Sequence, residues 1–166
     1  MVLAKDYDEL QVGIAEFKVT VAPNRLITLG LGSCVGVSLY DPVMKLGGLL
    51  HIMLPDSTQF KDVSKPAKFA DLGIPVLISD LKRRGGNVSR FQSKLVGGAQ
   101  MFSGMDKKMI LNIGERNYKA ARQILKDLRI RILAEELGGN RGRTMIFDTA
   151  TGEVFIRTLG GVNRVI

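Results

Sequence analysis

The chain carries a single cysteine, Cys34, and a single histidine, His51, both within residues 25–55. Each lies beside a run of residues typical of a β-strand, and the residues between these runs, 41–45, have the composition of a turn. We expect a hairpin that folds His51 back toward Cys34. Cysteine attacks as the thiolate, and a neighbouring imidazole is a common base for its proton. The pair therefore indicates nucleophilic catalysis by cysteine.

The residues around Cys34 are suited to an exposed turn at the end of a strand. Gly32 and Ser33 precede it, and this break favours main-chain N–H groups of Ser33 or Cys34 that point at a developing oxyanion, with Gly32 as backbone support. Thr28, on the entering strand, is a candidate for orienting the imidazole through its hydroxyl or its backbone carbonyl. Each residue also has a purely structural interpretation: a buried small hydrophobe for Cys34, a hydrogen-bonded core side chain for His51, and simple β propensity for Thr28.

Length and composition predict one globular domain over residues 1–166, because 166 residues with 45% hydrophobic content suffice for a substantial core. No stretch approaches the roughly 20 apolar residues that span a bilayer, and the first residues do not resemble a signal peptide. We therefore expect a cytoplasmic protein without membrane insertion. One cysteine excludes an intramolecular disulfide, and one Cys with one His falls short of a usual zinc set, so we expect no metal and no cofactor.

The net charge of +8 raises the possibility of nucleic-acid binding. The basic clusters are short and dispersed, however, and the chain has no Trp and only three Tyr to stack on bases. We expect solvated basic faces and no nucleic-acid partner. Such a surface equally favours docking to an acidic protein.

Periodicity along the chain predicts an α+β fold with two main helices among eight or nine strands. Strands are expected at 10–20 (with a slip or bulge near residues 15–16), 26–31, 35–40, 46–54, 93–101, 129–135, 143–147 and 153–157. Helices are expected at 71–84, with Asp71 as the N-cap, and after Asn112 as the cap of a second helix. Residues 56–68 read as a surface loop beside the site, with the possible role of a lid.

Small residues followed by a Met-Phe pair mark a second region of interest. The pair Gly97-Gly98 predicts a bulge or a close backbone approach. We expect Gly98, Gln100, Met101 and Phe102 to line a groove or a surface for substrate or partner, because exposed Met and Phe are adaptable in recognition. The alternative is that Met101 and Phe102 are core side chains.

Two motifs and several shorter ones, in this order, resemble a known family. The motifs are TLGLGSCVGV at 28–37 and GGLLHIMLP at 47–55, followed by KFAD at 68–71, KLVGGAQM at 94–101, IGERN at 113–117 and GGNRGR at 138–143. Together they resemble the CheD family of bacterial chemoreceptor glutamine deamidases.

The resemblance implies a catalytic triad at Cys34, His51 and Thr28, and a layered α/β/β sandwich like the catalytic domain of deamidating bacterial toxins. It implies hydrolysis of selected glutamines on methyl-accepting chemotaxis receptors to glutamate, through a thioacyl intermediate on the cysteine, and association with the CheC phosphatase. Glutamyl methylesterase activity is a secondary expectation. The alternative is a non-catalytic basic binding module that acts on chemotaxis partners such as CheC.

Overall fold

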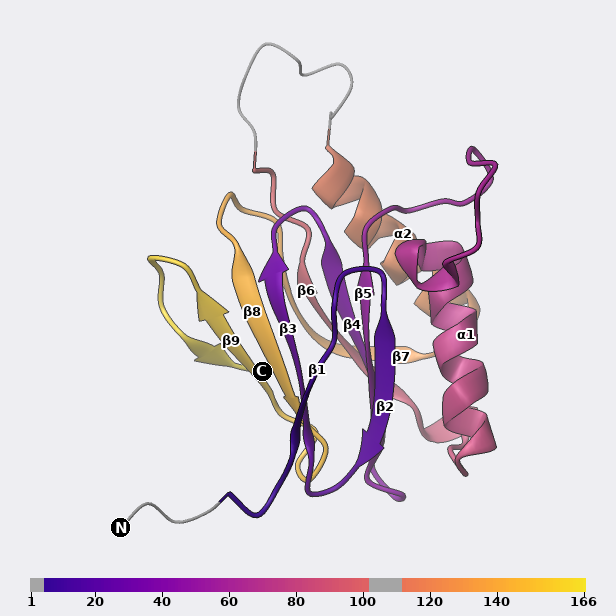
Figure 1. Cartoon of the computed structure of the whole chain (residues 1–166), viewed down its shortest axis with the longest axis vertical. Helices are drawn as coiled ribbons and strands as arrows, with labels where there is room; N and C mark the ends of the chain where they lie inside the picture. Colours follow the sequence, from indigo (N-terminus) through magenta and orange to yellow (C-terminus); the bar gives the residue numbers. More distant parts are fainter. Residues whose placement is uncertain (1–4, 102–111) are drawn as a thin grey trace.

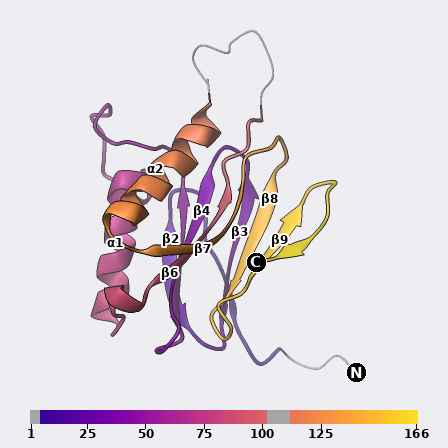
Figure 2. The same ribbon diagram turned by 180° about the vertical axis from the view of Figure 1, so that it is seen from behind.

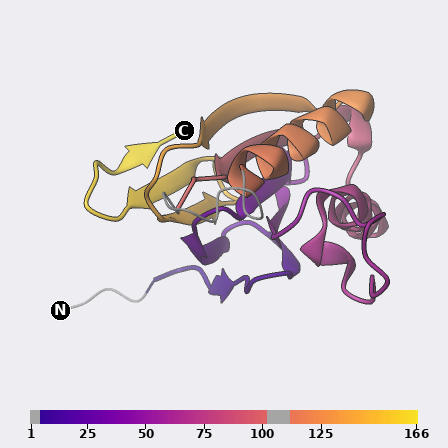
Figure 3. The same cartoon turned by 90° about the horizontal axis from the view of Figure 1, so that it is seen from above.

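The fold has three layers, one of helices and two of β-sheet (Figure 1). It is a computed structural model that describes residues 5–101 and 112–166. Helices α1 (Ala70–Arg83) and α2 (Ile113–Asp127) form the first layer and cover one face of a five-stranded sheet. That sheet, the middle sheet, packs with its other face on a second five-stranded sheet, the outer sheet, as the view along the layers shows (Figure 3).

Both sheets mix strands from distant parts of the chain. The middle sheet has the order β2-β5-β4-β6-β7, with β2 (Phe17–Val21), β5 (Leu46–Ile52), β4 (Val35–Asp41), β6 (Gln92–Gly97) and β7 (Arg131–Leu137). The outer sheet has the order β1-β3-β8-β9-β10, with β1 (Glu9–Gln11), β3 (Arg25–Leu31), β8 (Arg143–Asp148), β9 (Val154–Thr158) and β10 (Arg164–Val165). Two short 3-10 helices, η1 (Pro66–Lys68) and η2 (Val88–Arg90), complete the described elements.

The predicted α+β class, the α/β/β layering and the two main helices are confirmed. The single strand expected over residues 10–20 is wrong, because the chain crosses there from β1 in the outer sheet to β2 in the middle sheet. The interruption at Ala15 and Glu16 was placed correctly: both residues hydrogen bond to the main chain of His51, so two residues face one, and Ala15 has a φ of 60°. With this division and the short β10, ten strands are described where eight or nine were expected.

Helix α1 begins one residue earlier than predicted, and Asp71 is not its N-cap. Phe69, whose backbone is extended (φ −114°, ψ 140°), occupies the cap position without a side-chain hydrogen bond, and Asp71 is already helical. The Asp71 carboxylate instead accepts hydrogen bonds from the main chain (3.0 Å) and hydroxyl (2.6 Å) of Ser57. These hydrogen bonds hold the start of the loop that follows β5, residues 56–65, against the first turn of α1.

Two hydrophobic cores hold the layers together. One lies between the helices and the middle sheet and includes Leu50, Leu77 and Leu125. The other lies between the two sheets and includes Leu26, Leu49 and Phe147, with Cys34 packed at its margin. Every residue of β4 and β5 is buried, as expected for strands covered on both faces.

The turn after β6 is a place where two segments touch through their backbones. Gly97 has a φ of 114°, and a Cβ on it would lie 2.3 Å from the carbonyl oxygen of Cys34. The next residue, Gly98, donates its N–H to that same oxygen at 2.8 Å. The predicted close approach at Gly97-Gly98 is thus confirmed, and its partner is the segment that carries Cys34.

Substitution of Gly97 should therefore destabilise the fold far more than substitution of a nearby glycine that also has a positive φ but has no close neighbour. Gly138 has a φ of 81° and open space where a Cβ would be, and its N–H donates to the carbonyl of Gly97 at 3.0 Å. We expect Gly138→Ala to lower the free energy of unfolding by about 1 to 2 kcal/mol, through backbone strain alone. Gly97→Ala should lower it by at least about 3 kcal/mol. Urea unfolding of both variants measures the difference, and equal losses would contradict the close approach.

Candidate active site

The three side chains singled out in the sequence come from three segments that meet at one end of the sandwich. Thr28 lies on β3 of the outer sheet, His51 lies on β5 of the middle sheet, and Cys34 lies in the short link from β3 to β4 that carries the chain from one sheet to the other. The same end receives the start of α2 and the turn after β6 (Figure 2). The site is therefore assembled across the layers.

The expected hairpin is present, and its register brings His51 to the face of Cys34. Strands β4 and β5 pair antiparallel, with Gly36 opposite His51 and Val35 opposite Ile52. Cys34 immediately precedes β4 and packs on the core between the two sheets, the side to which the imidazole of His51 also points. Gly36 has no side chain to fill the space beside the imidazole. A Cβ there would lie 2.6 Å from the Met145 sulfur of the outer sheet.

The imidazole of His51 is oriented by a hydrogen bond between the two sheets. Its Nδ1 lies 2.7 Å from the hydroxyl of Thr28, and both residues are fully buried. The Thr28 hydroxyl donates its one proton to the carbonyl oxygen of Val12, also at 2.7 Å. A carbonyl oxygen cannot donate, so the hydroxyl has only a lone pair left for His51. Nδ1 must therefore carry the ring proton, and Nε2 presents its lone pair.

Nε2 of His51 is buried and has no hydrogen-bond partner among the residues that the structure describes. Burial also lowers the pKa of His51 to about 4, because the charged imidazolium loses its hydration. His51 therefore stays neutral near pH 7. A buried, neutral nitrogen with a free lone pair is suited to accept a proton at the moment of reaction.

Cys34 is partly exposed, and burial raises the pKa of its thiol, while its own main-chain N–H acts in the opposite direction. The resting state is thus a neutral thiol beside a neutral imidazole. Three successive carbonyl groups around the thiol are engaged: those of Gly32 and Cys34 accept from the main chain of Ala99 and Gly98, both at 2.8 Å. The third, that of Ser33, accepts from a side chain.

That side chain is Asn117 of α2, which the sequence interpretation did not single out. Its Nδ2 donates to the carbonyl oxygens of Ser33 and Met53, both at 2.9 Å, and the residue is fully buried. The signal was present in the sequence, because Asn117 falls on the apolar stripe of the helix, four residues before Ala121 and eight before Leu125. A polar residue on a buried stripe requires a specific partner.

The segment after β6, predicted as a substrate or partner surface, is only partly exposed. Gly98 is buried, whereas Gln100 and Met101 are exposed. Gly98 and Gln100 line a small cavity of about 130 Å³ together with residues of α2 and of the turn after β7. Met101 lies over Gly32, where an added Cβ would be 3.0 Å from its side chain. Phe102, the fourth residue predicted there, lies outside the described residues.

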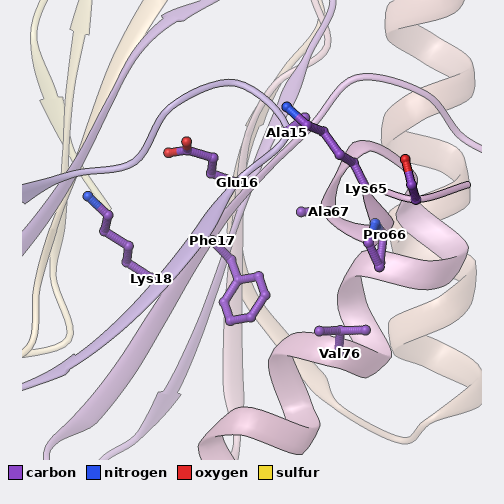
Figure 4. A pocket seen from close by; sticks show the side chains of 9 residues that line it. Ala15, Glu16, Phe17, Lys18, Lys65, Pro66, Ala67 and Val76 are labelled. Carbon is purple, nitrogen blue, oxygen red and sulfur yellow. The ribbon is translucent and has the colours of Figure 1, made fainter.

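A larger cavity of about 470 Å³ lies between β2 and the start of α1 (Figure 4). Phe17, Ala67 and Val76 are among the side chains that line it. Its wall includes Ala15 and Glu16, whose main chains hydrogen bond to His51 at 3.0 Å. The cavity thus lies beside the strand that carries His51, but none of the three candidate catalytic residues lines it.

Within residues 5–101 and 112–166, no three His, Cys, Asp or Glu side chains are grouped closely enough to hold a metal ion. The same part of the chain contains no helix with the length and apolar character needed to cross a membrane.

Comparison with known proteins agrees with the resemblance seen in the sequence. A model of the CheD family, described as CheD chemotactic sensory transduction, matches residues 53–158. A protein of Desulforamulus reducens named probable chemoreceptor glutamine deamidase CheD is 69% identical over 166 residues, which cover 100% of both chains. A protein of Clostridium botulinum with the same name is 53% identical over 155 residues, or 93% of this chain and 96% of that one.

Among solved structures, the crystal structure of the Bacillus licheniformis hypothetical protein YfiH matches with a TM-score of 0.44 and 18% sequence identity. The match covers 72% of this chain and 49% of that chain.

The tautomer of His51 can be tested directly, because the chain contains one histidine and its labelled ring gives one pair of nitrogen signals. We expect ¹⁵N NMR near neutral pH to show a proton on Nδ1 and a lone pair on Nε2. Thr28→Ser retains the hydroxyl and should preserve this state, whereas Thr28→Val leaves Nδ1–H without an acceptor and should give a mixture of tautomers. A wild-type ring protonated on Nε2 would contradict the assignment.

Burial of His51 should also make the fold less stable in acid. The pKa of about 4 in the folded state lies below the ordinary value of 6.5, so the unfolded chain binds the proton first as the pH falls. Between pH 6.5 and about 4 this linkage removes up to about 3 kcal/mol of stability, and above pH 6.5 it contributes nothing.

We expect His51→Gln to lack this part of the pH dependence, as measured by urea unfolding at a series of pH values. The comparison of the two proteins cancels the contribution of carboxyl groups that titrate in the same range. Parallel stability curves for the variant and the wild type would show that the folded-state pKa of His51 is not lowered.

Proposed function

The chain belongs to the CheD family, and on that premise we propose that it is a protein-glutamine deamidase that hydrolyses glutamine side chains of chemoreceptors to glutamate, with Cys34 as the nucleophile. Both relatives described above carry the name probable chemoreceptor glutamine deamidase. The receptor's cytoplasmic domain is the proposed substrate, and the cytoplasm is the proposed location.

The observation that carries this proposal is the state of His51. Its Nδ1 is committed to the Thr28 hydroxyl at 2.7 Å, and its buried Nε2 is left with a lone pair and no partner among the described residues. Cys34 immediately precedes the strand that pairs with the strand of His51, and it packs on the same side of the middle sheet. A structural core histidine would have both nitrogens satisfied, whereas a catalytic base needs one nitrogen free.

In the first half of the reaction, the Cys34 sulfur attacks the side-chain carbonyl carbon of the glutamine. Its proton passes to Nε2 of His51 as the carbon–sulfur bond forms, and the carbonyl oxygen becomes an oxyanion. The main-chain N–H groups of Ser33 and Cys34, which have no main-chain acceptor among the described residues, are the proposed donors to it. His51 then returns the proton to the nitrogen, ammonia leaves, and a thioester remains on Cys34.

In the second half, one water molecule attacks the thioester carbon while Nε2 of His51 takes its proton. The carbon–sulfur bond breaks, the proton returns to the sulfur, and glutamate is released. The sum is glutamine and water converted to glutamate and ammonia. The receptor gains one negative charge for each glutamine converted. Thr28 remains the positioning residue throughout, because its hydroxyl keeps the ring proton on Nδ1.

The same acyl centre makes glutamyl methyl ester hydrolysis the second candidate activity. Attack by Cys34 on the ester would give the same thioester, with methanol leaving in place of ammonia. His51 would supply the leaving oxygen with a proton in the same position. No further residue is required, so we propose methylesterase activity as a secondary property of the same site.

For partners, we propose the chemoreceptor cytoplasmic domain and the CheC phosphatase. Exposed Met101 lies against Gly32 of the Cys34 segment, and together with its exposed neighbour Gln100 it is the proposed contact surface of the described residues. The net charge of +8 favours an acidic partner and mainly raises the rate of encounter.

The proposal predicts that Cys34→Ala folds normally and leaves receptor glutamines unconverted, a loss of at least about a thousandfold. His51→Ala should lose activity comparably, since the chain has no other imidazole. Thr28→Ala should lose less, because a positioning residue matters less than the nucleophile. Mass spectrometry of a receptor cytoplasmic fragment incubated with each protein measures conversion of amide to acid.

Met44→Ala serves as the control, since Met44 is exposed in the β4–β5 turn, where the strands end away from the site. It should retain the wild-type rate. If folded Cys34→Ala still deamidated the fragment at that rate, covalent catalysis by Cys34 would be wrong. If the wild type bound the fragment without converting it and its thiol resisted iodoacetamide near neutral pH, the protein would be the non-catalytic basic binding module instead.

A further inference from the structure

We propose that Asn117 is a positioning residue that sets the oxyanion-binding geometry at Cys34, by holding the peptide group between Ser33 and Cys34 in one orientation. The proposal rests on the proposed role of Cys34 as nucleophile. It concerns a side chain from the helix layer that lies outside the Cys-His-Thr set.

The orientation of the Asn117 amide follows from its contacts. Two carbonyl oxygens, those of Ser33 and Met53, lie 2.9 Å from the same terminal atom. Only the NH₂ group can satisfy two acceptors, so the nitrogen faces them and both its protons are used. Its Oδ1 is buried without a hydrogen-bond partner among the described residues. An unsatisfied buried oxygen costs about 1 to 3 kcal/mol, a cost that the two hydrogen bonds of the amino group must offset.

The bond to Ser33 determines the direction of the next N–H. In a trans peptide group the C=O and N–H point in opposite directions. Because the Ser33 carbonyl points at Asn117 in the helix layer, the N–H of Cys34 points away from α2. That is the direction of the sulfur, since Cys34 packs on the core between the two sheets, and the same N–H favours the thiolate of its own side chain.

The other carbonyls beside the thiol do not depend on a side chain. Those of Gly32 and Cys34 are held by main-chain N–H groups of the turn after β6. Only the Ser33 carbonyl relies on a side-chain donor. Without Asn117, this peptide group has no bond to prevent rotation, and a rotated group would present a carbonyl oxygen to the developing oxyanion in place of an N–H donor.

A glycine in α2 allows the helix to approach closely enough for Asn117 to reach the Ser33 carbonyl. Gly114, one turn earlier, touches the turn after β6, and a Cβ on it would lie 2.5 Å from the carbonyl oxygens of Gly98 and Ala99. The second bond of Asn117, to Met53, reaches the chain two residues beyond His51. Asn117 therefore joins the segment of the nucleophile to the end of the strand that carries the base.

Two reactions of the sole cysteine separate oxyanion binding from thiolate reactivity. Acylation by p-nitrophenyl acetate passes through a tetrahedral oxyanion, whereas alkylation by iodoacetamide displaces iodide at a saturated carbon and forms no oxyanion. We expect Asn117→Ala to slow acylation about 10- to 100-fold, within the range for loss of oxyanion stabilisation, and to change alkylation by less than about threefold. Asn117→Asp keeps the shape of the side chain, but its carboxyl group loses its proton as the pH rises and can then no longer donate to the Ser33 carbonyl. We expect the acylation rate of this variant, relative to that of the wild type, to fall as the pH rises.

Leu125→Ala is the matched control, because Leu125 is fully buried on the same helix, eight residues further along, and its truncation destabilises without contact to Ser33. It should leave the ratio of acylation to alkylation unchanged. All rates are measured well below each variant's Tm, and Asn117→Asp replaces Asn117→Ala if the latter does not fold.

An unchanged acylation rate in the folded Asn117 variants, or an equal fall in both reactions, would overturn the proposal. So would a wild-type Cys34 that neither reagent modifies. Receptor deamidation is assayed in parallel and judged separately: a wild type that leaves the receptor unchanged but shows the expected ratio would overturn the proposed substrate and keep the role of Asn117.

Discussion

The hydrogen bond between Thr28 and His51 is the interaction on which the arrangement of the site depends, because it joins the two sheets of the sandwich. It forms only if the sheets are packed at the right distance, and that distance is set by the core between them, including Leu26, Leu49 and Phe147. Gly36, opposite His51, contributes because its lack of a side chain lets Met145 of the outer sheet pack closely there. The orientation of one buried ring therefore depends on the packing of the whole interface between the sheets.

A threonine behind the histidine has different electrostatic consequences from a carboxylate. A carboxylate would stabilise the charged imidazolium and raise the pKa of the ring, whereas a neutral hydroxyl only fixes its tautomer. Burial then dominates, which lowers the pKa of His51 to about 4 and raises that of Cys34. Both groups are therefore uncharged at rest, and in the proposed mechanism the proton transfer from Cys34 to His51 accompanies the attack on substrate.

Much of the fold could be predicted from the sequence, because β4 alternates clearly, β3 and β5 are short apolar runs, and a turn separates β4 from β5. Because the chain has one Cys and one His, the predicted hairpin leaves only one candidate Cys-His pair. The division of residues 10–20 between two sheets could not be predicted, since alternation is the same whichever sheet a strand joins. Asp71 has the sequence of an N-cap but binds Ser57, a contact decided by the loop. The position of Asn117 on the apolar stripe of its helix signals a buried polar contact, but its partners could not be predicted, because they are main-chain carbonyls that any residue type provides.

The contacts of the Cys34 segment are spread unevenly along the chain, and this has a consequence for biosynthesis. Thr28, Cys34 and His51 lie within the first third of the chain and emerge from the ribosome early, but the groups that hold the carbonyls of residues 32 to 34 come from Gly98, Ala99 and Asn117. The strand that pairs with β3 in the outer sheet, β8, follows later still. A nascent chain thus carries these three residues before the groups that support the Cys34 segment have been synthesised, and the thiol acquires its folded surroundings only after those later segments are made.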